Sequence, residues 1–167
     1  MKITIGTLAA GLIGFKGASY SADAWNPVVY AGNAGNDQDW SGLYIAAEES
    51  TAQGYLPDTV ENGYAYIHQV SFTGNVDMIT CLDESFKTGN INMGSLKEAL
   101  RENSIPVGND ELLMPRLGEL GYIFKCYNNE EGAIEIIVPN SMLDHIQMYK
   151  YKMCEMKNYT VLYCKPC

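Results

Sequence analysis

Alternation of large with small or polar side chains is clearest over residues 64–72, and this period of two predicts a β-strand. Apolar runs bounded by glycine or by turn residues predict further strands at 27–32, 42–47, 121–127, 133–138 and 159–163. Residues 128–132, Asn-Asn-Glu-Glu-Gly, have the composition of a turn between two of these strands.

Two segments are predicted to be helical. Residues 48–55 begin with two glutamates, which the helix dipole favours in a first turn. Residues 95–102 begin with Ser95 and carry Glu98 three positions later, the pattern of a capping box. Because strands outnumber helices and the connections are short, we predict an α+β domain built on one or two small antiparallel sheets.

The first 24 residues support two different predictions. An early lysine, an apolar stretch over residues 3–15 and small residues near its end are typical of a secretion leader. The glycines within that stretch favour instead two short strands, Ile3–Ile5 and Leu12–Phe15, around a glycine-rich turn. Residues 25–167 are predicted to form a single domain in either case.

The charge balance argues against nucleic acid as a partner. The 167 residues include 11 lysines and arginines and 20 aspartates and glutamates, which gives a net charge of −9 at pH 7. Nucleic acid attracts cationic surfaces through counterion release, so we expect no nucleic-acid partner. Apolar runs in the chain are shorter than the roughly 20 residues that a spanning helix needs, so we expect no membrane span.

The cysteines are odd in number: Cys81, Cys126, Cys154, Cys164 and Cys167. In an exported chain we expect two disulfides and one free thiol. Cys164 and Cys167 have the spacing of a redox motif, but such a motif normally lies between a strand and a helix rather than at the end of a chain. Zinc would need two further ligands near this pair, and both histidines, His68 and His145, lie far from it in sequence, so we predict no metal site.

The segment from Trp40 to Tyr55 carries the most informative chemistry. Tyr44 lies on a predicted strand, and Tyr55 lies eleven positions later at the end of the predicted helix. The two phenols could hold a flat cationic ring between them by stacking and cation–π attraction. The small residues of the segment would let the strand and the helix approach closely, namely Gly42, Ala46, Ala47, Ala52 and Gly54. The alternative is that both tyrosines are core residues on adjoining elements.

This segment resembles the diphtheria-toxin and exotoxin-A class of mono-ADP-ribosyltransferases. That class has the pattern Trp-x-Gly-Phe-Tyr-Ile-Ala, followed by a short helix that ends in Gly-Tyr. The matching positions are Trp40, Gly42, Tyr44, Ile45, Ala46, Ala52, Gly54 and Tyr55. The likeness covers roughly residues 27–72 and 118–140, and its specific part is 40–55.

The resemblance implies an ADP-ribosyltransferase-like fold, a pair of small antiparallel sheets with a few short helices, and it implies NAD as a substrate. It places nicotinamide between Tyr44 and Tyr55, with Trp40 over the ligand. The first strand of the class is similar to Tyr30-Ala31-Gly32, whose backbone would orient the nicotinamide amide. Alanine at position 31 replaces the histidine with which the class holds the adenosine ribose.

The class also has a catalytic glutamate on a later strand, after an acidic loop that contains glycine. Residues 130–137 are similar to that segment and make Glu135 the candidate, with Glu131 as the fallback. A carboxylate suits the chemistry because loss of nicotinamide builds oxocarbenium character on the ribose, which an anion stabilises. The loop before Glu135, roughly residues 115–132, would face the target protein. Arginine-modifying relatives carry Glu or Gln two positions before the catalytic residue, and Ala133 there makes arginine a less favoured acceptor.

The sequence therefore predicts an NAD-dependent mono-ADP-ribosyltransferase. We expect a secreted toxin or effector that modifies a target protein of a host or competitor cell, a role compatible with a delivery or immunity partner. Two alternatives stay open. One is a non-catalytic binding protein on the same scaffold, and the other is a secreted hydrolase or deamidase that uses Cys81 and His68.

Overall fold

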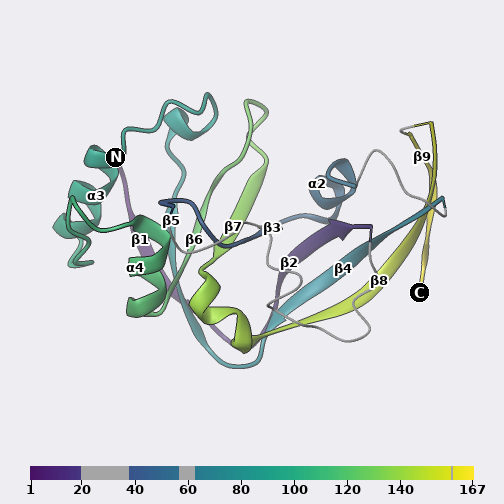
Figure 1. Ribbon diagram of the computed structural model, residues 1–167, viewed down its shortest axis with the longest axis horizontal. Coiled ribbons are helices and arrows are strands. Elements are labelled where there is room, and N and C mark those ends of the chain that lie inside the picture. The colour runs from purple at the N-terminus through teal and green to yellow at the C-terminus, as the bar shows by residue number, and fades with distance from the viewer. Residues whose placement is uncertain (20–37, 57–62, 159) are drawn as a thin grey trace.

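The computed structural model describes residues 1–19, 38–56, 63–158 and 160–167 (Figure 1). These residues form a mixed α+β fold, in which a nine-stranded sheet is accompanied by a few short helices. The strand order is β1-β5-β6-β7-β3-β2-β4-β8-β9. Neighbouring strands are antiparallel, except that β5 and β6 are parallel.

The strands are β1 (Thr4–Leu8), β2 (Gly11–Ala18), β3 (Leu43–Ala46), β4 (Tyr64–Phe72), β5 (Val76–Cys81), β6 (Tyr122–Tyr127), β7 (Ile134–Val138), β8 (Ile146–Lys157) and β9 (Thr160–Pro166). The α-helices are α2 (Glu49–Gly54), α3 (Met93–Glu102) and α4 (Leu113–Leu120), and two 3-10 helices are η1 (Glu84–Phe86) and η2 (Asn140–His145). Within the described ranges, the helices are too short or too polar to cross a membrane.

The sheet has two halves that meet where β2 lies beside β3. A single residue pair, Phe15 with Ala46, joins these two strands in the part of the chain that the structure describes. Gly14 permits this approach, because a β-carbon there would lie 2.5 Å from the carbonyl oxygen of Ala46. The sheet is nevertheless continuous, so of the predicted one or two small sheets the structure has one large sheet, and the pair of sheets that the resemblance implied is wrong. The parallel pairing of β5 with β6 also departs from that expectation.

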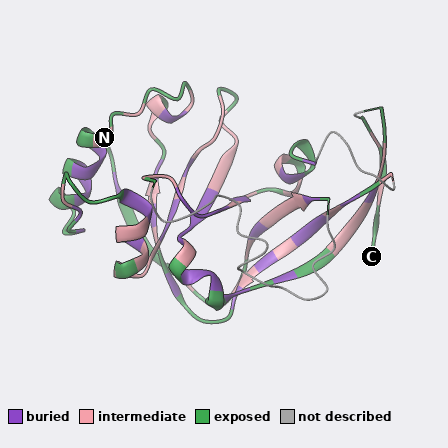
Figure 2. Cartoon of the chain, in the orientation of Figure 1, coloured by how far each residue is buried: buried purple, intermediate pink, exposed green. Residues whose placement is uncertain are grey.

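Apolar clusters lie on both faces of the sheet, and Figure 2 shows buried residues along the strands of both halves. One cluster packs β5, β6 and β7 against α3 and α4, with Leu100, Leu117 and Phe124 fully buried. A second cluster covers the other face and includes Met142 and Leu143 of η2. Because both faces are covered, β6 and β7 read as nearly continuous apolar runs rather than as alternating ones.

Most predicted elements correspond to observed ones. The expected strands at 42–47, 64–72, 121–127, 133–138 and 159–163 are β3, β4, β6, β7 and β9. The expected helix at 48–55 is α2. Residues 4–8 and 11–18 are strands, as in the second of the two predictions for the N-terminal segment. The run at 27–32 lies outside the described residues.

The start of α3 differs from the prediction. The helix begins at Met93, and the side chain of Asn92 accepts a hydrogen bond of 2.9 Å from the backbone N–H of Ser95. Asn92 has the extended backbone of a cap residue, at φ −87° and ψ 112°. The predicted capping box at Ser95 is therefore wrong, because Ser95 and Glu98 already lie inside the helix.

Residues 115–132 are not one loop, as the resemblance suggested. They include most of α4 and all of β6, which leaves 128–132 as the turn before β7. Pro115 argues against a helix when the sequence is read alone, but it is the third residue of α4. Proline is tolerated in a first turn because the N–H that it lacks would have no partner within the helix.

One disulfide joins Cys154 of β8 to Cys164 of β9, which are opposite each other in the antiparallel register. Cys81, Cys126 and Cys167 are free. The expectation of two disulfides is therefore wrong, because Cys81 and Cys126 stay reduced within the core. Because Cys164 is disulfide-bonded to Cys154, it forms no redox pair with Cys167.

Candidate functional site

A pocket of about 220 Å³ opens beside the ends of β6 and β7. Trp40, Tyr44 and Glu135, which are three of the predicted site residues, line it. Phe86 and Tyr127 add two further aromatic walls, and Cys126 lies next to Glu135. The structure thus brings Trp40 and Glu135, which are 95 positions apart in sequence, into one pocket.

The register between β3 and β7 explains why Tyr44 and Glu135 share this pocket. Ala46 is opposite Glu135, and Tyr44 is opposite Ile137. Side chains two positions apart on a strand point to the same face, so all four side chains lie on one face of the sheet. Tyr44 and Glu135 are then diagonal neighbours, which in an antiparallel pair lie roughly 7–8 Å apart.

Trp40 and Tyr44 are held to each other and to the core. The Trp40 ring lies 5.9 Å from Phe86 and 5.8 Å from Phe124, measured between ring centroids. The Tyr44 hydroxyl donates a hydrogen bond of 2.5 Å to the backbone carbonyl of Trp40. Lys16 of β2 donates to the Tyr44 carbonyl at 3.3 Å, and burial lowers the pKa of this ammonium group. These contacts fix the phenol in the wall of the pocket.

Tyr55 follows α2 and is about half exposed, with a relative accessibility of 50%. Burial, followed by the charge of Glu135, raises the pKa of its phenol, while a hydrogen bond with the side chain of Asn129 opposes this rise. Tyr55 is not among the residues that line the pocket, so its pairing with Tyr44 stays a prediction. Tyr44, by contrast, forms part of the pocket wall.

Close approach of α2 to the sheet depends on a glycine that the sequence analysis did not consider. A β-carbon at Gly17 of β2 would lie 2.5 Å from the carbonyl oxygen of Ala52. Gly42 instead permits the close approach of β3 to β7, since a β-carbon there would lie 2.5 Å from the carbonyl oxygen of Val138. Gly54 does not contribute to the close approach of the helix, because a β-carbon there would meet nothing within 4 Å.

Glu135 is a partly buried carboxyl group, and burial raises its pKa to about 7. Its partners on the two adjacent strands are Ala46 and Cys126, neither of which offers a positive charge. A carboxyl group in such an environment binds its proton more tightly than in water. Perturbed groups of this kind occur often at functional sites.

The turn before β7 is ordered by Asn129. Its side-chain oxygen accepts hydrogen bonds of 3.1 Å from the backbone N–H groups of Glu131 and Ala133. Gly132 adopts φ +83°, a conformation that glycine adopts readily. The fallback residue Glu131 lies on the exposed part of this turn, whereas Glu135 lines the pocket.

Lys87 lies immediately after η1 and beside Tyr127, which lines the pocket. Its Nζ is 4.6 Å from the centre of the Tyr127 ring and 3.2 Å from the exposed carboxylate of Glu84. Its stem lies close to Gly132, where a β-carbon would be 3.7 Å from Lys87 Cε. Lys87 thus spans from η1 to the turn that precedes Glu135.

The alternative pair Cys81 and His68 is not brought together. Cys81 is buried on β5 and His68 is buried on β4, and the strands β6, β7, β3 and β2 lie between them in the sheet. Burial also raises the pKa of Cys81 to about 11, which favours the neutral thiol over the nucleophilic thiolate. These two residues cannot act on one substrate.

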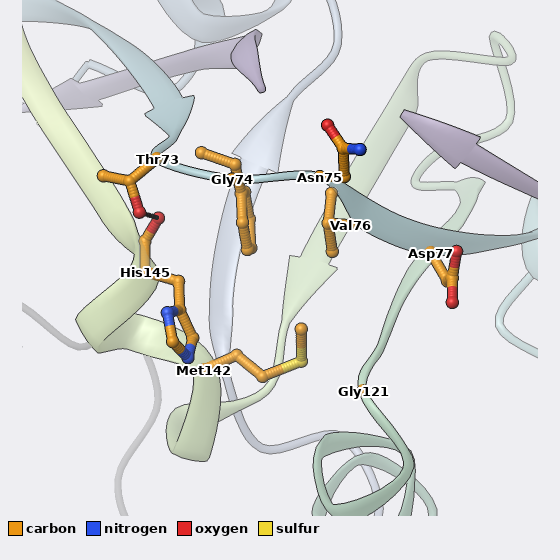
Figure 3. A pocket seen from close by; sticks show the side chains of 9 residues that line it. Thr73, Gly74, Asn75, Val76, Asp77, Gly121, Met142 and His145 are labelled. Atoms are coloured by element: carbon orange, nitrogen blue, oxygen red, sulfur yellow. Dashed lines mark hydrogen bonds between the residues drawn. The ribbon is translucent and has the colours of Figure 1, made fainter. Parts of the chain in front are cut away.

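A larger pocket, of about 450 Å³, lies at the other end of β6, under the turn between β4 and β5 (Figure 3). Its polar groups bond to neighbouring segments of the chain. Thr73 Oγ1 donates to the His145 carbonyl at 3.1 Å, and Asp77 accepts from Thr7 Oγ1 at 2.7 Å. The predicted site residues do not line this pocket, so we do not assign the chemistry to it.

The structure does not test the predicted NAD contacts of the first strand of the motif. Tyr30, Ala31 and Gly32 lie outside the described residues, so their contacts with NAD stay predictions. Within the described ranges, no cluster of three or more His, Cys, Asp or Glu side chains could hold a metal ion. Comparison with protein-family models and with curated proteins finds no match to this chain.

Sequence reasoning missed the walls that Phe86, Gly89 and Tyr127 contribute to the pocket. The sequence did contain a signal for Tyr127, because this residue ends an apolar run just before the predicted turn. A hairpin of that run with β7 places Tyr127 at the end of the strand pair where Glu135 lies. Residues 84–91 carry no comparable pattern. Their position depends on packing of Phe86 against Trp40 and Phe124.

Proposed function

We propose that this protein is an NAD-dependent mono-ADP-ribosyltransferase, which transfers ADP-ribose to a target protein and releases nicotinamide. One observation carries the proposal: the register of β3 and β7 places Glu135 on the same face as Tyr44, within a single aromatic pocket. The motif alone predicts these residue types, whereas their convergence depends on the pairing of distant strands.

The arrangement suits attack on the ribose of NAD. Tyr44 and Trp40 offer aromatic faces to the nicotinamide ring, and Tyr55 would approach from α2. As the glycosidic bond breaks, its electron pair leaves with nicotinamide and positive charge develops on the ribose. The carboxylate of Glu135 would stabilise that charge. The nucleophile of the target protein then bonds to the ribose carbon and releases its proton.

Lys87 would bind the diphosphate of NAD, because its ammonium group lies 4.6 Å from the ring of Tyr127, which lines the pocket. We expect Lys87→Met to weaken NAD⁺ binding about tenfold, the usual scale for one charge-assisted contact. Nicotinamide riboside, which carries no phosphate, should bind equally well to both proteins. Calorimetry with the two ligands checks this, and an equal loss for both would assign Lys87 to packing rather than to the diphosphate.

Activity should rise with pH through neutrality. Only the ionised form of Glu135 can stabilise the ribosyl cation, and burial raises the pKa of this group to about 7. We therefore expect kcat to fall about tenfold for each pH unit well below 7 and to be constant above about 8. The measurement is nicotinamide release at saturating NAD⁺ from pH 5.5 to 9. A flat profile would count against Glu135 as the ionising group.

The function itself is tested with biotinylated NAD⁺ and a cell lysate. We expect one or a few lysate proteins to become labelled, together with release of nicotinamide. A second candidate is a non-catalytic binding protein on the same scaffold, which the alanine at position 31 favours. No heat on titration with millimolar NAD⁺ would support that second candidate.

A further inference from the structure

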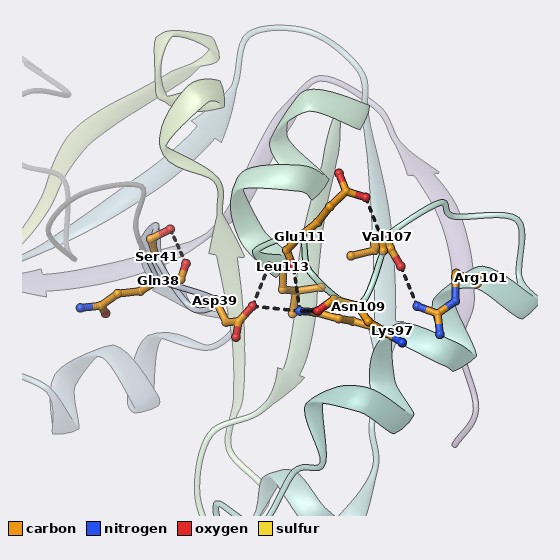
Figure 4. A network of polar contacts seen from close by, with 10 residues as sticks. Gln38, Asp39, Ser41, Lys97, Arg101, Val107, Asn109, Glu111 and Leu113 are labelled. Carbon is orange, nitrogen blue, oxygen red and sulfur yellow. Dashed lines mark hydrogen bonds and ion pairs between the residues drawn. The ribbon is translucent and has the colours of Figure 1, made fainter.

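Lys97 of α3 is a charged residue buried in the fold, with a relative accessibility of 5%. Its Nζ donates to the backbone carbonyls of Glu111 at 2.6 Å and Asn109 at 3.4 Å, and lies 3.4 Å from Oδ1 of Asp39 (Figure 4). A buried ammonium group is costly unless its protons have acceptors. These three oxygens provide one acceptor for each proton.

Asp39 also holds the start of α4. Its Oδ1 accepts a hydrogen bond of 2.9 Å from the N–H of Leu113 (Figure 4). Its carbonyl oxygen accepts a hydrogen bond of 2.9 Å from the N–H of Met114. The first N–H groups of a helix have no partner within it. The residue at the cap position, Leu112, has no side chain that could serve them. Asp39 therefore caps α4 from a distant part of the chain.

Asp39 directly precedes Trp40, and this connects the buried network to the candidate site. Trp40 lines the pocket, and its carbonyl oxygen accepts the hydrogen bond from the Tyr44 hydroxyl. Lys97 is outside the pocket wall, so it can affect a ligand there only through Asp39 and the backbone that follows. The contacts form a continuous path from Lys97 to the Tyr44 phenol.

We propose that Lys97 is a positioning residue for the candidate pocket. Its ion pair with Asp39 sets the place of the Trp40 ring and, through the Trp40 carbonyl, that of the Tyr44 phenol. The effect on NAD binding rests on the proposed function. The effect on the environment of Trp40 does not, so the two can be measured separately.

The test compares Lys97→Met with Arg101→Met. Methionine keeps the length and the apolar stem of lysine but removes the charge. Arg101 lies one turn later on α3 and donates a hydrogen bond of 2.8 Å to the Val107 carbonyl, in the connection that leads from α3 to α4 (Figure 4). Arg101→Met thus removes a cation that holds the same connection without acting on Asp39.

The direct readout is the fluorescence of Trp40 in a Trp25→Phe background, which leaves one tryptophan because the chain has two. Lys97→Met should increase acrylamide quenching about threefold, since a segment that loses its anchor opens locally more often. The KM for NAD⁺ should rise about tenfold with kcat changed less than about threefold, the pattern of a displaced binding wall. Arg101→Met should match the parent protein in both measurements.

A folded Lys97→Met protein with parental quenching and KM would overturn the inference and leave the proposed function standing. If quenching rises but neither protein binds NAD⁺, positioning stands and the proposed function fails. Should Lys97→Met not fold, the double variant Lys97→Met/Asp39→Asn removes both charges and keeps an oxygen for the N–H of Leu113. Increased quenching there supports the inference, whereas failure of both variants to fold, with Arg101→Met intact, would show a purely structural role.

Discussion

Replacement of Glu135 by glutamine should lower kcat for ADP-ribose transfer by about 10²–10³, the usual loss when one stabilising group at a developing charge is removed. Glutamine keeps the size of the side chain and its place opposite Ala46, but it cannot carry the negative charge that the ribosyl cation requires. Binding of NAD⁺ should change little, since the charge matters mainly in the transition state. Nicotinamide release and transfer of labelled ADP-ribose both measure the effect.

The same variant should be more stable than the parent protein at high pH, although it is less active. The pKa of Glu135 is about 7 in the fold, whereas a glutamate in water has an ordinary pKa of 4.5, so the folded protein holds the proton more tightly than the unfolded chain does. Ionisation of the unfolded chain therefore destabilises the fold as pH rises above 4.5, and the effect is complete above 7. Glu135→Gln should melt above the parent protein at pH 8.5 and together with it at pH 4.

Glu131→Gln is the matched control, because Glu131 lies on the exposed turn four residues earlier. We expect its kcat within about threefold of the parent protein, as for most surface changes outside a site. If instead Glu131→Gln loses transfer and Glu135→Gln keeps it, the catalytic role belongs to Glu131. If both keep it, the carboxylate mechanism is wrong.

Local patterns predicted β3, α2, β4 and β7 because each has its own signal within about ten residues. The period of two in β4 and the two glutamates at the start of α2 need no knowledge of the rest of the fold. Tyr44, Tyr55 and Glu135 could be selected for the same reason, since a short motif and a charged position on an apolar strand are visible in sequence.

Other features depend on contacts between distant residues. The N-terminal cap of α4 is Asp39, which is 74 positions away from Leu113, so a search for a cap next to the helix could not find it. The register that pairs Ala46 with Glu135 likewise joins segments with no sequence signal for their pairing. The raised pKa of Glu135 follows from that burial, and the sequence alone predicts an ordinary carboxylate.

Gly42→Ala should be among the most destabilising single substitutions in the chain. Gly42 has φ +142°, which side chains rarely adopt, and a β-carbon there would lie 2.5 Å from the carbonyl oxygen of Val138 and 3.0 Å from Cγ2 of Ile137. The carbonyl oxygen is backbone, so it cannot move away without moving β7, which pairs with β3 directly after Gly42. Backbone strain and overpacking together predict a loss of about 3–5 kcal/mol in the free energy of unfolding.

For a chain of this size such a loss lowers Tm on the order of 10 °C. Gly54→Ala makes the same chemical change in the same motif, at a position where a β-carbon meets nothing within 4 Å. It should melt within about 2 °C of the parent protein, because alanine is if anything the better residue in a helix. Equal melting of the two variants would mean that β3 does not approach β7 so closely. The register that places Tyr44 beside Glu135 would then be wrong as well.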